Sequence, residues 1–228
     1  MGFDVTTKDC TALDDTELEA FADMCVDGPA KFDIGTLSKQ RELWVLVTTV
    51  REGNKLHGFS FSTLERIGGT PCVLVGLASV RRTAKRDQVL RALVHEEERR
   101  AWLAFPDEDV LVGARFGNAG AFLAYKALSD IVPRPDHRPT GEERAWSRRL
   151  AKRFGLERNI DDRTFILRGD GSRPGVLDFE TSKPEKLDPA VVAYFDALDD
   201  DRGDSLVAFG WATAEELQVI GSPSRKMV

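Results

Sequence analysis

The stretch from Cys72 to Trp102 constrains the fold most, because it joins a buried strand to an amphipathic helix through a short basic turn. Its strand reads PCVLVGLASV and carries no charge before Arg81. Its turn reads RRTAKRDQ, and its helix reads VLRALVHEEERRAW. The helix is expected from about Asp87 to Ala104. Its packing face is predicted to comprise Val89, Leu90, Leu93, Val94, Glu97 and Ala101.

The turn is the first candidate for a binding site. A strand that leads into a helix directs backbone N–H groups and the positive end of the helix dipole toward the turn. Arg81, Arg82, Lys85 and Arg86 add side-chain charge there, and this combination can hold a phosphate. The alternative is an ordinary strand–helix unit with a solvated run of charge. The charged stretch at residues 96–100 is likewise expected to be solvated helix surface.

Length and composition limit the classes of protein to which the chain can belong. The chain has 228 residues, of which 42% are hydrophobic and 31% charged, an ordinary balance for a globular protein that buries its own core. Its formal net charge of −6 disfavours binding to nucleic acid or to an anionic membrane surface. No run approaches the roughly 18 apolar residues of a membrane-spanning helix. The N-terminus, MGFDVTTKDC, lacks the features of a signal peptide.

The cysteines and histidines indicate a reducing compartment and no metal site. Cys10, Cys25 and Cys72 are odd in number and form no C-x-x-C pair, so buried thiols are expected instead of disulfides or a zinc site. The three histidines are scattered along the chain. The acidic run at residues 199–201 lacks the pattern of an EF-hand loop and indicates a solvated turn. We therefore expect a cytoplasmic protein without a resident metal.

Periodicity and turn residues predict an alternation of helices and strands. The expected helices cover residues 14–26, 87–104, 119–129, 141–154, 188–198 and 213–221. The expected strands cover residues 43–50, 56–64, 72–80, 109–114, 163–168, 176–179 and 205–210. Residues 1–11 show no clear periodicity, and residues 30–41 are expected to be a connector, with or without a short helical turn.

Local signals also predict how some of these elements begin and pair. Asp14 with Glu17, and Thr140 with Glu143, have the spacing of capping boxes. The first three strands are expected to form a meander. The strand at 109–114 follows the strand at 72–80 through a helix, so the two are predicted to be parallel neighbours. Residues 176–179 are expected to be the return strand of 163–168.

The order of these elements resembles the GNAT N-acetyltransferase superfamily. The most specific match lies at residues 109–128, where a strand leads to Asn118, Ala121 and Tyr125 at the family's spacing. Gly58-Phe59, in the second meander strand, is also similar to the family. The resemblance covers about residues 12–130. It implies an α/β fold (an α+β mixed sheet) that is mostly antiparallel, with a splayed parallel pair and flanking helices.

The resemblance also implies the domain organisation. We expect residues 1–228 to form a single GNAT-like domain, with an inserted loop–helix segment at about residues 130–160.

In the family, acetyl-CoA lies in the gap between the splayed strands, and this resemblance implies a cofactor site here. The strand before the turn binds the pantetheine through its backbone, and amides of a glycine-rich turn hold the pyrophosphate. Gln88 and Leu90 stand where the family has small residues, and their side chains crowd a phosphate that approaches the backbone. Either the turn is wider and binds phosphates through basic side chains, or the site no longer binds CoA. The implied cofactor-binding residues are Val80, Lys85, Arg86, Asp87, Gln88, Val89, Leu90 and Asn118.

The resemblance places Tyr125 where many members of the family have the tyrosine that protonates the departing CoA thiolate. A phenol suits that role as a general acid, and the alternative is a tyrosine packed in the core. Asn118 either orders the cofactor or caps the helix that follows it. Glu65 and His137 are the candidate general bases, and catalysis through a water molecule is the alternative.

Two functions remain open at this point. The first is an N-acyltransferase that moves an acetyl or other acyl group from acyl-CoA to an amine of a small molecule or peptide. Trp146 and the arginines of helix 141–154 would then line the acceptor side. The second is a catalytically inactive GNAT-like binding or assembly module that has lost CoA binding. Neither involves nucleic acid or a membrane, and a homodimer is compatible with both.

Overall fold

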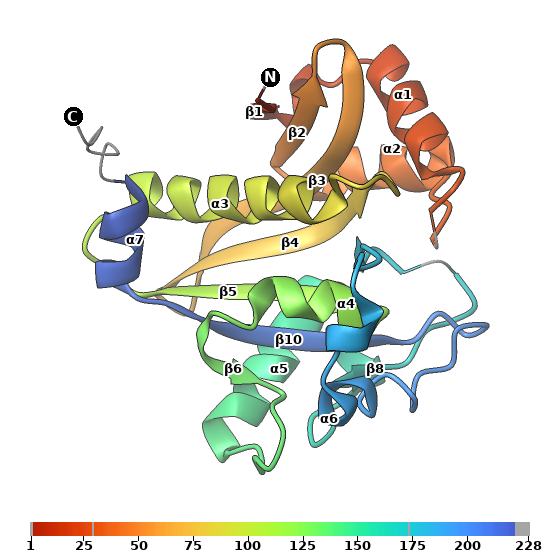
Figure 1. The fold of residues 1–228 in the computed structure, drawn as a ribbon. Helices are drawn as coiled ribbons and strands as arrows, with labels where there is room; N and C mark the ends of the chain where they lie inside the picture. Colours follow the sequence, from red (N-terminus) through yellow and green to blue (C-terminus); the bar gives the residue numbers. More distant parts are fainter. Residues whose placement is uncertain (1, 29, 173, 222–228) are drawn as a thin grey trace.

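The computed structural model describes residues 2–28, 30–172 and 174–221, which form a mixed sheet with helices on both faces (Figure 1). The strand order is β1-β2-β3-β4-β9-β5-β10-β8-β7, and β6 pairs with β10. The strands are β1 (Asp4–Asp9), β2 (Leu46–Glu52), β3 (Lys55–Ile67), β4 (Thr70–Val80), β5 (Val110–Phe116), β6 (Ser129–Val132), β7 (Ile160–Asp161), β8 (Ile166–Leu167), β9 (Leu177–Asp178) and β10 (Ser205–Ala212). The α-helices are α1 (Asp15–Cys25), α2 (Ile34–Leu43), α3 (Arg86–Ala104), α4 (Ala119–Phe122), α5 (Gly141–Arg153), α6 (Pro189–Val192) and α7 (Ala214–Gly221).

The pairing confirms the fold class expected from the sequence. β2, β3 and β4 form the antiparallel meander, with Thr49 opposite Phe59 and Ser60 opposite Ala78. β4 and β5 are parallel at one end, where residues 72–75 pair with residues 111–114. β10 runs antiparallel to β5. The result is a mixed sheet with a splayed parallel pair and flanking helices.

Successive residues of β3 face opposite layers of helices. Gly58 faces α3, where a Cβ would lie 2.6 Å from Val89 Cγ1, so a glycine is needed for this close approach. Phe59 faces the other way and stacks on Phe21 of α1, with ring centroids 4.3 Å apart. α3 therefore covers one face of the sheet, and α1 covers the other.

A second close approach holds the ends of α2 and α5 against the centre of the sheet. A Cβ at Gly76 would lie 1.9 Å from Trp44 Cε2, so the indole lies directly on β4. Trp44 Nε1 donates to Gln40 Oε1 at 2.9 Å, and the guanidinium of Arg153 sits 4.8 Å from the ring centroid. Leu150 of α5 packs similarly over Gly113 of β5.

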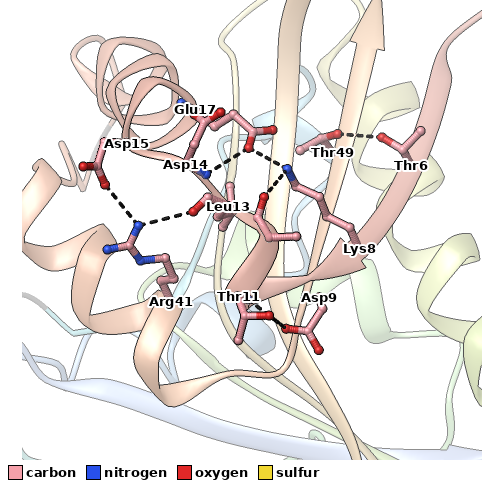
Figure 2. A network of polar contacts seen from close by, with 11 residues as sticks. Thr6, Lys8, Asp9, Thr11, Leu13, Asp14, Asp15, Glu17, Arg41 and Thr49 are labelled. Carbon is pink, nitrogen blue, oxygen red and sulfur yellow. Dashed lines mark hydrogen bonds and ion pairs between the residues drawn. The ribbon is translucent and has the colours of Figure 1, made fainter.

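Both capping boxes predicted from the sequence are present. The box at the start of α1 is part of a polar network with β1 (Figure 2). Glu17 N donates to Asp14 Oδ1 at 2.8 Å, and Glu17 Oε2 accepts from Asp14 N at 3.2 Å. Lys8 Nζ donates to the same Glu17 oxygen at 2.5 Å. The box at Thr140 and Glu143 starts α5.

Replacing Asp14 by alanine is expected to lower the free energy of unfolding by about 1 kcal/mol, because the N3 amide of α1 loses its acceptor. Urea unfolding followed by circular dichroism measures this change. Glu19→Ala is the matched control, since Glu19 is an exposed carboxylate within the same helix. Equal losses in the two variants would contradict a capping role.

A strand forms within residues 1–11, and a helix of 10 residues forms within the connector expected at residues 30–41. β1 is an edge strand whose Thr6 hydroxyl bonds that of Thr49 across the pair at 3.0 Å. α2 is capped by Asp33, which accepts from Thr36 N at 2.7 Å.

Two expected helices are wrong in length. The one expected at 119–129 is reduced to α4 and a 3-10 turn (Leu123–Tyr125), because the chain enters β6 at Ser129. The one expected at 188–198 is reduced to α6, which ends at Val192.

Three further observations concern the cysteines, the helices and the metal-ligating side chains. Cys10, Cys25 and Cys72 are buried and unpaired. None of the helices in the described parts of the chain is both long enough and apolar enough to cross a bilayer. The same parts hold no cluster of three metal-ligating side chains.

Candidate functional site

The candidate site lies where the parallel strands β4 and β5 separate. Beyond Val75 and Ala114 the two strands no longer pair with each other, and β9 enters between them. Leu177 lies opposite Ala78 of β4 and also pairs with Phe116 of β5. We call residues 175–182, which contain β9, the plug segment.

The plug segment bonds to β4 as a parallel strand. Ala78 N donates to Val176 O at 3.1 Å, and Ser79 pairs with Asp178, whose carboxylate accepts from the serine hydroxyl at 3.4 Å. Leu177 is 2% exposed. The edges of two separating buried strands need partners for their N–H and C=O groups. The chain supplies those partners itself.

This position corrects the pairing expected for residues 176–179. The sequence predicts a return strand for residues 163–168, whereas β8 pairs with β7 and β10. The short turn at residues 169–175 suggested a local hairpin. In the gap between β4 and β5, a strand has a buried strand edge on each side. In a hairpin at the rim of the sheet, it would have a partner on one side only.

Two basic residues of the turn before α3 bind the plug segment. Arg82 Nε forms an ion pair with Glu180 Oε2 at 2.6 Å. Arg86 Nη2 donates to Thr181 O at 3.2 Å. The plug segment therefore follows the route from the strand gap to the basic turn that the resemblance assigned to the cofactor.

The other two basic residues of the turn are bound by the meander. Lys85 Nζ contacts both carboxylate oxygens of Glu52, at 2.6 and 2.7 Å. The ion pair holds the pKa of Glu52 below its usual value. Arg81 Nε donates to Leu56 O at 3.0 Å. All four cations that the sequence offered as phosphate ligands thus have protein partners.

The backbone amides at the start of α3 are also engaged. Arg86 N donates to Thr83 O at 3.1 Å, and Gln88 N donates to Lys85 O at 2.9 Å. The carboxylate of Asp87 lies in the first helical turn and accepts a short hydrogen bond from the Ser182 hydroxyl. A carboxylate there complements the helix dipole and repels an incoming phosphate.

The apolar residues expected to bind the cofactor are packed in the core. Val80, Val89 and Leu90 are 6%, 0% and 6% exposed. Asn118 caps α4, because its Oδ1 accepts from Ala121 N at 2.9 Å. The capping interpretation of Asn118 is therefore confirmed.

Tyr125 is a buried residue of the turn after α4. Its hydroxyl donates to Glu97 Oε2 of α3 at 3.0 Å, and its ring meets Phe116 edge-on at 5.4 Å. Burial raises the pKa of Glu97 to about 8 and that of Tyr125 well above its usual value. Both groups therefore carry their protons at neutral pH. The solvated surface expected at residues 96–100 is wrong for Glu96 and Glu97, which are 7% and 5% exposed.

The two candidate bases are each bonded to another side chain. Glu65 Oε1 lies 2.6 Å from Arg153 Nε. His137 Nε2 lies 2.8 Å from Glu143 Oε2. Neither shares a hydrogen bond with Tyr125, so the structure does not bring these three residues together.

A hollow of about 530 Å³ lies beside the plug segment and is acidic. Its lining includes Asp178, Asp200, Asp201 and Asp204. Burial raises the pKa of Asp178 to about 6, and the bond from Arg202 holds the pKa of Asp204 at about 2. The sequence analysis missed this site and the plug segment, because both form between residues that are distant in the chain.

Several acetyltransferases are among the solved structures that are similar to this chain. No family model matches the chain, and no curated protein matches it in sequence. A probable acetyltransferase from Staphylococcus epidermidis is 10% identical, with a TM-score of 0.47 over 92% of this chain and 99% of that one. The ribosomal-protein-S18-alanine N-acetyltransferase of Escherichia coli is 13% identical, with a TM-score of 0.43 over 99% of both chains. The aminoglycoside 6'-N-acetyltransferase of Enterococcus faecium is 12% identical, with a TM-score of 0.41 over 51% of this chain and 64% of that one.

Proposed function

We propose that this protein is a GNAT-fold binding or assembly module that does not take up acyl-CoA. The observation that carries the proposal is the position of β9 between β4 and β5. In the family's fold that gap receives the cofactor, and here the plug segment fills it.

Three features of the plug segment and of the turn before α3 make acyl-CoA a poor fit. The backbone of β4 at Ala78 is already hydrogen-bonded to Val176. The cations of the turn are paired, two of them with the plug segment itself. Two carboxylates, Asp87 and Glu180, stand at the turn, where a pyrophosphate would meet their negative charge.

Acetyl-CoA at about 1 mM is expected to leave the melting temperature of the protein unchanged. A ligand with a Kd near 10 μM would add about 2.7 kcal/mol at that concentration. For a chain of this length, that gain would raise the melting temperature by roughly 5 °C or more. A thermal shift series with acetyl-CoA, longer acyl-CoAs and free CoA measures the effect, and a saturable rise with any of them would contradict the proposal.

A second candidate is an N-acyltransferase that transfers an acetyl group from acyl-CoA to a small-molecule or peptide amine. It is favoured by Tyr125, which holds its proton and follows Asn118 at the family's spacing. This activity requires the plug segment to leave the gap. Its strand is short, since β9 spans only Leu177–Asp178.

The variant Glu180→Lys discriminates between the two candidates, because it places a cation opposite Arg82 and loosens the plug segment. A module that has lost the site shows no acetyl-CoA response in either protein. A plugged acyltransferase shows a larger thermal shift in the variant than in the wild type. Glu185→Lys is the matched control, since Glu185 is exposed and follows the plug segment in the chain.

A further inference from the structure

Three arginines surround a pocket that lies outside the strand gap. The pocket has a volume of about 240 Å³ and is lined by Arg138, Pro139, Arg144 and Arg163. Arg138 belongs to the segment that precedes α5, Arg144 to the first turns of α5, and Arg163 to the turn between β7 and β8. No carboxylate of the described residues lines this pocket.

None of the three guanidinium groups forms a hydrogen bond or an ion pair with the residues that the structure describes. Arg163 is the least isolated of them, because its backbone N–H and, to a smaller extent, its charge lower the pKa of Asp161. Arg144 Nε is buried without a hydrogen bond. Neighbouring arginines differ: Arg148 is paired with Asp162, and Arg149 lies 4.7 Å from the ring centroid of Trp146. The pocket therefore gathers three cations that form no ion pair, in a chain whose net charge is −6.

The carboxylates nearest in sequence are committed to other groups. Glu143 accepts from Thr140 N at 2.7 Å and from His137 Nε2 at 2.8 Å. Asp161 Oδ1 accepts from the backbone N of Arg163 at 3.0 Å. Neither carboxylate forms an ion pair with a guanidinium group of the pocket, and Asp161 interacts with the charge of Arg163 only at longer range.

An arrangement of this kind is unfavourable without a ligand. Like charges brought together repel each other, and a buried N–H without an acceptor carries a desolvation cost. The start of α5, with its N-cap at Thr140, adds the positive end of a helix dipole. Each of these effects becomes favourable when an anion occupies the pocket.

We infer that this pocket binds a small anion that carries a phosphate or carboxylate group. Guanidinium groups present paired N–H donors that match the oxygens of both groups. Arg144 would donate from the pocket wall, and Arg138 and Arg163 from the rim. A volume of about 240 Å³ lies below the range of about 300–1,000 Å³ of drug-sized sites, so the anion is small.

This inference is independent of the proposed function. The pocket contains no residue of the plug segment or of the turn before α3. An anion can therefore bind here whether or not the strand gap takes acyl-CoA.

Calorimetric titration with inorganic phosphate and with citrate, at constant ionic strength set by sodium chloride, tests the inference. Saturable binding of at least one anion is expected, and the stronger of the two identifies the group that is recognised. Arg144→Gln and Arg163→Gln should each weaken that binding at least tenfold. Arg158→Gln removes the same charge from an exposed position outside the pocket and should change it less than twofold.

A folding control separates loss of a ligand site from loss of structure. Without anion, Arg144→Gln is expected to melt at the same temperature as the wild type or higher, because it removes a guanidinium group whose Nε is buried without a hydrogen bond. A lower melting temperature together with unchanged anion affinity would assign Arg144 a structural role and overturn the inference. Absence of saturable binding by both anions would overturn it too, as would equal affinities in wild type and variants.

Discussion

Replacing Glu97 by glutamine is expected to stabilise the protein at pH 9 by roughly 4–5 kcal/mol and to change its stability little at pH 5. Burial raises the pKa of Glu97 from 4.5 to about 8. The folded protein therefore keeps this proton up to about pH 8, whereas the unfolded chain loses it above about pH 4.5. The contribution of Glu97 to stability is fully present below pH 4.5 and is lost as the pH rises to about 8.

The glutamine side chain is neutral at every pH and still offers an oxygen to the Tyr125 hydroxyl, so the hydrogen bond is retained. Burial also raises the pKa of Glu98 to about 7 and that of Asp178 to about 6. Part of the pH dependence of stability therefore remains in the variant. Urea unfolding at pH 5, 7 and 9 measures the change. Glu19→Gln, at an exposed position, is the control, and parallel pH profiles for wild type and Glu97→Gln would refute the assignment.

Replacing Leu177 by alanine is expected to lower the free energy of unfolding by about 2–5 kcal/mol, the range for deleting a buried leucine side chain. Leu177 is 2% exposed and lies between Ala78 of β4 and Phe116 of β5. The loss would leave a cavity in the middle of the sheet. In a protein whose gap stands open for a cofactor, the same substitution would be nearly neutral.

Leu103→Ala is the matched control, because Leu103 is 52% exposed and should change stability by less than about 0.5 kcal/mol. Denaturant unfolding of both variants gives the comparison. A near-neutral Leu177→Ala would show that the plug segment is not seated in solution. That result, together with a thermal shift by acetyl-CoA, would favour the acyltransferase.

Much of the fold is visible in the sequence because it rests on local signals. The capping pairs at Asp14 and Thr140 mark the starts of α1 and α5. The apolar run that ends at Val80 and the amphipathic helix after it predict the parallel pairing of β4 and β5. Periodicity also placed Glu97 on the packing face of α3. Composition alone suggested solvent exposure for the same residue, and the structure supports the periodicity.

The rest depends on contacts that local patterns do not encode. Residues 176–179 carry the signal of a strand, but nothing near them specifies β4 and β5 as neighbours. The turn before α3 shows basic residues in the sequence, and only the fold brings Glu52 and Glu180 to them. β1 was missed because an edge strand rich in threonine has no apolar alternation to detect.

The position of β9 also has a consequence for the order of folding. The hydrogen bond between Ser79 and Asp178 joins residues 99 positions apart in the chain. Closing so long a loop costs entropy before any contact is gained, so this pairing forms late compared with the meander. During synthesis, β4 and β5 emerge long before their shared partner, and their splayed ends have to remain without it until residue 178 is available.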